Sequence, residues 1–259
     1  MGTLTIDRKD AVTTVTLRNP GKLNAISIEM WRAIEQAFTS LSADESVRCI
    51  VVRGADGNFA AGADIAQFPK ARGDLEQLQV FHREIIAPSL RAIVDCAHPL
   101  VALIEGFCIG GGLEIAACCD LRIAGASSRF GAPIHKLGFA MAPDELRALL
   151  SVASRATALE LLLEGRILDA LEARERGLVT RVVVDDGVAA EAYATAARIA
   201  AMAPLANRIS KRLVRRLAPA ADPLSEAEIE ESFAYWNSHD HHEGVTAFLE
   251  KRPPLFRGA

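Results

Sequence analysis

The sequence predicts an α/β protein with an all-helical C-terminal part. Short apolar strand patterns alternate with helical patterns through the first three quarters of the chain, an order typical of α/β proteins. From about Val188, alanine-rich helical patterns follow one another to the end. The 259 residues suffice for one large domain with an appendage. We expect an α/β core over residues 1–195 and a helical region over residues 196–259.

The N-terminal elements follow from local patterns. Alternation over residues 4–17 predicts a β-hairpin. Ser27 is placed to cap a helix whose apolar residues recur at helical spacing as far as Leu41. Residues 49–53 predict a short buried strand, which runs into the segment FAAGAD at residues 59–64.

The next elements repeat this order. Residues 75–94 have a helical pattern, in which Pro88 predicts a kink. Residues 99–104 predict a buried strand that leads into CIGGGLE at residues 108–114, where a short helix begins. Residues 121–124 predict another strand.

Composition limits the classes of partner. The net charge of −4 does not favour a nucleic-acid ligand, and the basic run at residues 211–216 has the spacing of a solvated helix face. No apolar run reaches the ~18 residues that span a bilayer, and no secretory signal pattern is visible, so we expect neither a membrane partner nor export. The five cysteines lack CxxC spacing. We interpret them as buried apolar residues in a reducing cytoplasm.

The histidine-rich segment at residues 239–242 raises a metal hypothesis. Asp240 and Glu243 instead have the spacing of a helix capping box. No further ligand set accompanies the histidines, so we expect no metal site.

The two glycine-bearing loops each follow a predicted strand. A strand that ends in Gly110-Gly-Gly112 and opens a helix leaves backbone N–H groups free for an anion. Neither a phosphate-loop Gly-Lys-Ser/Thr nor GxGxxG is present, which leaves an oxyanion hole or a tight turn. Two such loops can each supply one N–H to a thioester oxygen, with a glutamate nearby to move protons. That pairing favours enolate chemistry.

Several segments occur together in one order: NPGKLNAIS from Asn19, FAAGADI from Phe59, GGGLEIAACCDLRIA from Gly110, SRFGAP from Ser128, and the closing EGVTAFLEKR. Together they resemble the enoyl-CoA hydratase/isomerase family, the crotonase superfamily, and the resemblance runs essentially end to end. It implies a spiral of ββα units with a C-terminal helical trimerisation region. It also implies an acyl-CoA substrate, no separate cofactor, and a homotrimer or dimer of trimers.

The resemblance also implies site residues. The oxyanion N–H groups are those of Ala63 and Gly111, and Glu114 matches the first catalytic glutamate of the hydratases. Phe248 and Lys251 match positions that reach the CoA of a neighbouring subunit. The other expected substrate contacts are Lys22, Leu23, Ala25, Ala61, Asp64, Ile65 and Ile134.

The chain departs from the hydratase pattern at Ile134, which stands where a second glutamate is expected. Asp144 and Glu145 follow shortly after and are candidates for the missing acid, although Pro143 with two following acids also has the pattern of a helix start. His135 is a further titratable neighbour.

These observations predict an enzyme that stabilises a thioester enolate, most directly a hydratase-like lyase acting on a 2-enoyl-CoA. An isomerase, an acyl-CoA hydrolase or a retro-aldol-type enzyme with a single carboxylate remain alternatives. A homologue that binds CoA or a protein partner with weak catalysis is an alternative of another class, against which the presence of Glu114 argues.

Overall fold

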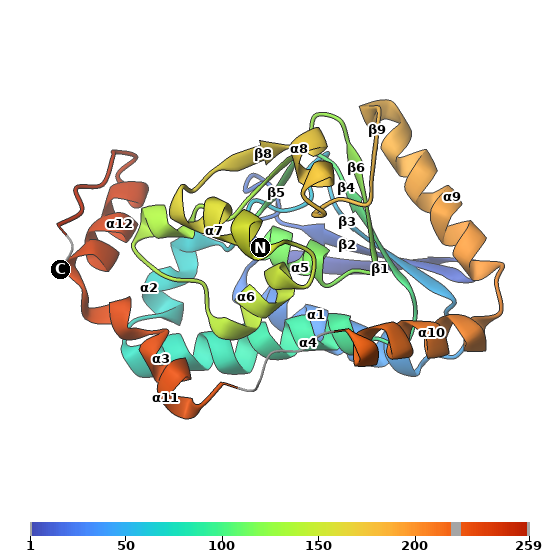
Figure 1. The fold of residues 1–259 in the computed structure, drawn as a ribbon, viewed down its shortest axis with the longest axis horizontal. Coiled ribbons are helices and arrows are strands. Elements are labelled where there is room, and N and C mark those ends of the chain that lie inside the picture. The colour runs from blue at the N-terminus through green and yellow to red at the C-terminus, as the bar shows by residue number, and fades with distance from the viewer. Residues whose placement is uncertain (1, 219–223, 258–259) are drawn as a thin grey trace.

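The computed structural model describes residues 2–218 and 224–257, and it contains two sheets (Figure 1). The larger sheet has the order β1-β2-β3-β4-β6-β9 and the smaller one the order β5-β7-β8. The strands are β1 (Thr3–Lys9), β2 (Val12–Arg18), β3 (Cys49–Gly54), β4 (Leu100–Ile104), β5 (Phe107–Ile109), β6 (Leu121–Gly125), β7 (Arg129–Gly131), β8 (Ile167–Asp169) and β9 (Arg181–Val183).

The helices alternate with these strands and then continue alone to the C-terminal end. The α-helices are α1 (Ile28–Ala43), α2 (Phe68–Ala71), α3 (Leu75–Val80), α4 (Ala87–Asp95), α5 (Gly111–Ala117), α6 (Pro143–Leu150), α7 (Arg155–Leu163), α8 (Ala170–Glu175), α9 (Val188–Ala200), α10 (Pro204–Leu217), α11 (Glu226–Glu231) and α12 (His239–Leu249). The α/β prediction and the helical C-terminal part are confirmed.

The larger sheet begins with the predicted hairpin. β1 and β2 pair antiparallel, and β2, β3, β4, β6 and β9 then pair in parallel. Strand β4 is buried along its whole length, as expected for a central parallel strand that is covered on both faces.

Alternate residues of the central strands supply two separate cores. Ile50 and Val52 of β3 face a large core shared with α1 and α4, whereas Cys49 and Val51 face α9 on the other side. This division follows from the two-residue period of a strand. The α9 helix runs through residue 195 and packs Ala192 and Ala196 on the sheet. The expected boundary between residues 195 and 196 therefore lies inside α9, and its C-terminal side includes residues 219–223 and 258–259, outside the described residues.

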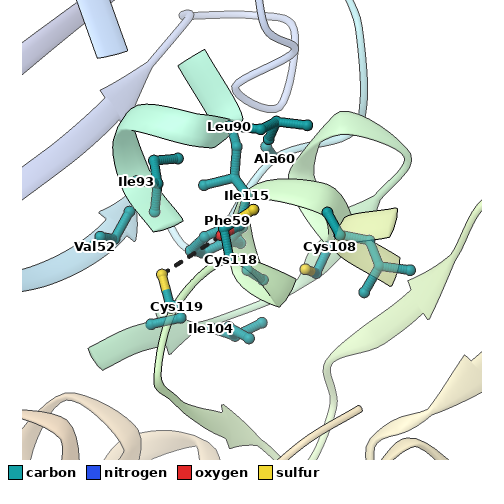
Figure 2. Close-up of a cluster of buried hydrophobic side chains, with 14 of the residues drawn as sticks. Val52, Phe59, Ala60, Leu90, Ile93, Ile104, Cys108, Ile115, Cys118 and Cys119 are labelled. Atoms are coloured by element: carbon teal, nitrogen blue, oxygen red, sulfur yellow. Dashed lines mark hydrogen bonds between the residues drawn. The ribbon is translucent and has the colours of Figure 1, made fainter. Parts of the chain in front are cut away.

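Helix α5 is buried in the larger core (Figure 2). Ile115, Cys118 and Cys119 pack there with Leu90 and Ile93 of α4, and the Cys119 Sγ lies 3.5 Å from the Ile115 carbonyl oxygen. All five cysteines are free and buried, as the sequence predicts. Because α5 carries the glycine loop and Glu114, this packing fixes the position of both.

Two local predictions need correction or refinement. The helix over residues 75–94 is irregular, but the irregularity is a π-helical turn (Phe81–Ile86) that ends before Pro88, which lies in the first turn of α4. The predicted capping box of Asp240 and Glu243 is wrong. Ser238 caps α12 by accepting the His241 N–H, because it lies one residue before the helix.

The basic run at residues 211–216 is also not a purely solvated face. Lys211 is almost buried, pairs with Asp120 at 2.8 Å and donates to the His98 carbonyl. Arg215 pairs with Asp95 at 2.6 Å. These contacts hold the basic side of α10 against the core, so the apolar side of the helix faces outward.

Candidate active site

The two glycine loops lie side by side in parallel register. The Ala60 N–H donates to the Phe107 oxygen and the Ile109 N–H donates to the Ala60 oxygen, which pairs Ala60 with Cys108. Beyond this bridge the two chains stay close, since a Cβ built on Gly110 would lie 3.6 Å from the Gly62 Cα. Ala63 and Gly111, the next residue of each loop, line the same cavity.

The bridge between Ala63 and Ile26 leaves the Ala63 N–H without a hydrogen-bond partner among the described residues. Residues 62 and 64 exchange hydrogen bonds with Ile26, through Ile26 N–H to the Gly62 oxygen at 2.7 Å and Asp64 N–H to the Ile26 oxygen at 2.9 Å. In such a parallel bridge the intervening N–H points to the opposite side. Ala63 lines a cavity on that side.

The Gly111 N–H is free because of its place in a helix. Gly111 is the first residue of α5, and the first N–H groups of a helix have no partner within it. Gly110 turns the chain into α5 with a φ of 49°, and a Cβ built on it would lie 3.6 Å from the Gly62 Cα. A Cβ on Gly111 would lie 2.9 Å from Cζ2 of Trp31. Glycine at these positions permits both the turn and the tight packing.

The cavity beside these donors has a volume of about 350 Å³. Its wall is mostly apolar, and it includes three buried charged or ionisable side chains. The lining residues are Trp31, Ala61, Gly62, Ala63, Ile65, Phe68, Arg72, Ile86, Ile109, Gly110, Gly111, Glu114, Pro133, Ile134, Lys136, Leu137, Phe139, Glu145, Phe248, Arg252 and Pro254.

Two carboxyl groups share this cavity. Glu114 comes from α5 and Glu145 from the first turn of α6, and each is 5% exposed. Burial raises the pKa of Glu114 well above its ordinary value, and the proximity of Glu145 raises it further. Burial also raises the pKa of Glu145, against the opposing effect of Arg72. The two groups therefore lose their protons in successive steps at higher pH than an ordinary glutamate, and between these steps one carboxyl group is protonated and the other is ionised.

His82 holds the side chain of Glu145. Its Nδ1 contacts Oε1 of Glu145 in a short hydrogen bond. Burial lowers the pKa of His82 well below its ordinary value while it raises that of Glu145. The imidazole is therefore neutral, and its hydrogen bond orients Glu145 without a positive charge beside the carboxyl group.

The structure separates the two candidates for the missing acid. Glu145 faces the cavity, whereas the Asp144 carboxylate is 41% exposed and lies 3.7 Å from Arg147. This follows from helix geometry, because neighbouring residues of α6 face different sides. Ile134 lines the cavity as an apolar wall, and His135 lies beside it without being part of the lining.

The remaining predicted contacts lie in the wall or near it. Ala61, Ile65 and Phe248 line the cavity, and Phe248 does so within its own chain. Five others lie outside the lining that the described residues form: Lys22, Leu23, Ala25, Asp64 and Lys251. Lys22 pairs with Asp64 at 2.7 Å, and the Leu23 oxygen accepts the Ala61 N–H. Residues 22 and 23 thus stabilise the first glycine loop on the side away from the cavity.

Sequence reasoning missed three features of the site: Trp31, Arg72 and His82. Trp31 has only the signal of a core residue at helical spacing. Arg72 follows α2 in a segment without periodicity, and His82 lies in the π-helical turn, so no motif marks either of them. Within residues 2–218 and 224–257 no group of three or more His, Cys, Asp or Glu side chains is placed to hold a metal ion. None of the helices described there is long and apolar enough to cross a bilayer.

Comparison with known proteins agrees with this geometry. The family model for enoyl-CoA hydratase/isomerase matches residues 7–259. A probable enoyl-CoA hydratase of Mycobacterium tuberculosis is 35% identical over 257 residues, which cover 98% of this chain and 97% of that protein.

Solved structures show the same similarity. An enoyl-CoA hydratase/carnithine racemase from Magnetospirillum magneticum is 44% identical, covers 100% of this chain and 97% of its own, and superposes with a TM-score of 0.82. A methylmalonyl-CoA decarboxylase in complex with 2-nitronate-propionyl-CoA is 27% identical, covers 99% and 98% of the two chains, and gives a TM-score of 0.88. The motifs, the fold and the whole-length matches together place this chain in the enoyl-CoA hydratase/isomerase family, whose members act on CoA thioesters.

Proposed function

We propose that the protein adds water to the double bond of a 2-enoyl-CoA thioester. The observation that carries this proposal is the pair of buried carboxyl groups, Glu114 and Glu145, in the same cavity as the N–H groups of Ala63 and Gly111. The homologous hydratases support the same reaction class.

The proposed reaction begins with the thioester oxygen accepting the Ala63 and Gly111 N–H groups. The ionised member of the carboxyl pair takes a proton from water, whose oxygen bonds to C3 of the acyl chain. Electrons of the double bond move onto the thioester oxygen, and the two N–H groups stabilise this enolate. The protonated member then gives its proton to C2. The sum is the addition of one water molecule, and CoA enters only as part of the substrate, so the reaction needs no separate cofactor.

The division of labour within the pair is part of the proposal. Because each carboxyl group makes ionisation of the other less favourable, a single proton shared by the pair supplies one base and one acid at the same pH. Glu145 would supply the second carboxyl group that is absent because Ile134 occupies the position of the second glutamate. With two acids in the cavity, there is no need to assume an isomerase that works with a single carboxylate.

The test is an assay of crotonyl-CoA and longer 2-enoyl-CoA thioesters, in which hydration, double-bond migration and release of free CoA are measured separately. We expect loss of the enoyl absorbance with formation of 3-hydroxyacyl-CoA and no free CoA. Migration of the double bond, or CoA release, as the main outcome would contradict hydration and favour the corresponding alternative.

We also propose that α10 forms part of an interface between copies of this chain, in a homotrimer or a dimer of trimers. Its apolar side is exposed although its basic side is held to the core. The exposed apolar side chains are Leu205, Ile209, Leu213, Val214 and Leu217, and exposed apolar patches of this kind mark interaction surfaces. Sedimentation at micromolar concentration should give a trimer or hexamer, and a monomer would refute the proposal.

Two further expectations stay proposals. The core over residues 1–195 would hold the oxyanion N–H groups and both carboxyl groups, and the region over residues 196–259 would provide the interface and, through Phe248, Arg252 and Pro254, part of the cavity wall. The five free, buried cysteines are compatible with a reducing compartment, which supports a cytoplasmic location.

A further inference from the structure

Arg72 is the one buried charged side chain in the described lining of the cavity that the proposed hydration does not use. It follows α2 directly, its N–H donates to the Phe68 oxygen, and it is 5% exposed. Its guanidinium carbon lies 3.8 Å from the ring centre of Phe68, 4.8 Å from that of Phe81 and 4.9 Å from that of Phe139. Three aromatic rings therefore enclose the cation within the cavity wall.

Two of the three guanidinium nitrogens of Arg72 lack a partner among the described residues. Its Nε and Nη1 are fully buried and find no hydrogen-bond acceptor within the described part of the chain. Buried polar atoms are almost always paired, so such an exception calls for an explanation. The hydroxyl of Tyr235 is a second buried group without a partner there, and Tyr235 lies behind the cavity lining, of which Phe139 is part. Tyr235 lies against Phe139, with ring centres 6.2 Å apart, and is near enough for the charge of Arg72 to act on its pKa.

Arg72 keeps its charge in the folded protein. Burial lowers the pKa of Arg72 to about 10, which still leaves the guanidinium protonated at neutral pH. Glu114 and Glu145 have raised pKa values, and His82 is neutral. Two carboxyl groups that share one proton carry one negative charge, which offsets that of Arg72, but neither group accepts a hydrogen bond from the Nε or Nη1 of Arg72. A compact anion would complete the arrangement.

Two other roles explain Arg72 less well. The charge of Arg72 does lower the pKa of Glu114 and Glu145, but this effect acts through space and leaves the buried Nε and Nη1 without an acceptor. The phosphates of CoA are large and hydrated, and the exposed cations Lys136 and Arg252 of the lining are better suited to such groups than a cation enclosed by three phenyl rings.

We propose that Arg72, assisted by the Tyr235 hydroxyl, binds a carboxylate on the acyl chain, so that the substrates are thioesters of dicarboxylic acids. The inference rests on the proposed function in one respect, because it assumes that the acyl chain enters this cavity from the N–H groups of Ala63 and Gly111. Arg72 is then a specificity residue that touches the far end of the acyl group, and the aromatic rings position it.

Matched substrates test the proposal through turnover. Fumaryl-, glutaconyl- and 2-hexenedioyl-CoA would each be compared with crotonyl-, 2-pentenoyl- and 2-hexenoyl-CoA, which carry a methyl group in place of the carboxylate. We expect at least one carboxylate-bearing thioester to be preferred in kcat/KM by about 100-fold, the range for a charge-assisted hydrogen bond in a buried site. Arg72→Leu should abolish this preference, so that the ratio of kcat/KM within each matched pair falls to about 1; any change common to both substrates reflects the effect of Arg72 on the pKa of Glu114 and Glu145.

Three further variants separate carboxylate recognition from general electrostatics. Arg72→Lys should retain part of the preference, because it keeps the charge but not the planar set of donors. Tyr235→Phe removes only the hydroxyl and should lower the preference about 10-fold. Arg83→Leu removes the same charge from an exposed side chain outside the cavity, and it should leave the preference unchanged. Equal loss of turnover with both classes of substrate in Arg72→Leu would overturn the proposal in favour of a tuning role.

Binding measurements keep this test independent of the reaction. Succinyl-, glutaryl- and adipyl-CoA have no double bond, and calorimetry would compare them with butyryl-, pentanoyl- and hexanoyl-CoA. Tighter binding of a carboxylate-bearing thioester that Arg72→Leu removes would uphold the carboxylate site even if no enoyl-CoA is hydrated. Thioesters that end in a carboxamide test the wild-type protein without any variant. Equal affinity for the carboxylate, amide and methyl forms would overturn the proposal even if hydration is found.

Discussion

The cavity wall has two chemically different parts. One part consists of backbone, the N–H groups of Ala63 and Gly111, and the other of buried ionisable side chains, Arg72, Glu114 and Glu145. The backbone part is set by two parallel bridges, Ala60 with Cys108 and Ile26 with Ala63, and by the start of α5 at Gly111. The ionisable part is assembled from three separate segments and depends on burial for its properties. The comparison teaches that the first part is robust to exchange of side chains, whereas the second can be changed one group at a time.

The largest expected effect is in the ionisable part, at Glu114. Glu114→Gln removes a proton-transfer group but keeps the size of the side chain and the N–H donors. We expect kcat for enoyl-CoA hydration to fall about 10²–10⁴-fold, the usual contribution of a positioned acid or base. Affinity for a saturated acyl-CoA, measured by calorimetry, should stay within a few-fold of wild type. Full turnover in the variant would remove Glu114 from the mechanism.

In the backbone part, Gly111→Pro deletes an N–H that no side chain replaces. We expect kcat to fall about 10²–10³-fold, as for the loss of one oxyanion donor. Gly111→Ala is the matched control, since it adds a Cβ that also meets Trp31 at 2.9 Å but keeps the N–H. Circular dichroism would establish that both variants fold. Equal rates for the proline and alanine variants would contradict a role for the Gly111 N–H.

The two parts also differ in what the sequence alone predicts. The hairpin, the Ser27 cap, the buried strands and both glycine loops follow from local patterns, and the register of the loops follows once the strands pair. The ionisable part does not follow from such patterns. Asp144 and Glu145 are adjacent acids that the sequence does not distinguish as the second acid. Only the orientation of α6 about its axis decides that Glu145 faces the cavity and Asp144 faces solvent. Arg72 has a surface-like sequence context, and its burial results from Phe68, Phe81 and Phe139 folding around it.

The interpretation of Glu145 as the second acid gives a smaller effect. Glu145→Gln should lower kcat for hydration about 10–100-fold, because water or Glu114 can partly replace it. Asp144→Asn, one residue earlier on the exposed side of α6, should change kcat less than twofold. Steady-state hydration of crotonyl-CoA and of a preferred substrate would measure both. A larger effect of Asp144→Asn would reverse the assignment within α6.

The pH dependence of activity would show whether the pair shares a proton. One carboxyl group must be ionised to act as a base, and both pKa values are raised in the folded protein. The acidic limb of kcat/KM should therefore lie well above pH 4.5, the ordinary value for glutamate. In Glu145→Gln the limb should move toward lower pH, because the carboxyl group that raises the pKa of Glu114 is gone. An unchanged limb would mean that the two groups do not interact.

The smallest effect concerns stability. A carboxyl group whose pKa is raised by folding binds its proton more tightly in the folded state than in the unfolded chain. Its contribution is thus fully present below the unfolded pKa and is lost as pH rises through the folded pKa. For Glu145 this window runs from about 4.5 to about 8. Each pKa unit corresponds to about 1.4 kcal/mol, so the free energy of unfolding should decrease across this window in the wild type.

Glu145→Gln cannot ionise, and its amide can still hydrogen-bond to His82, so the decrease in the free energy of unfolding should be smaller in this variant. Urea unfolding at several pH values across the window would measure the difference, with Asp144→Asn as the control that retains the wild-type slope. If the two variants showed the same slope, burial of Glu145 would not govern its ionisation, and the contrast between the backbone and ionisable parts of the cavity would lose its electrostatic basis.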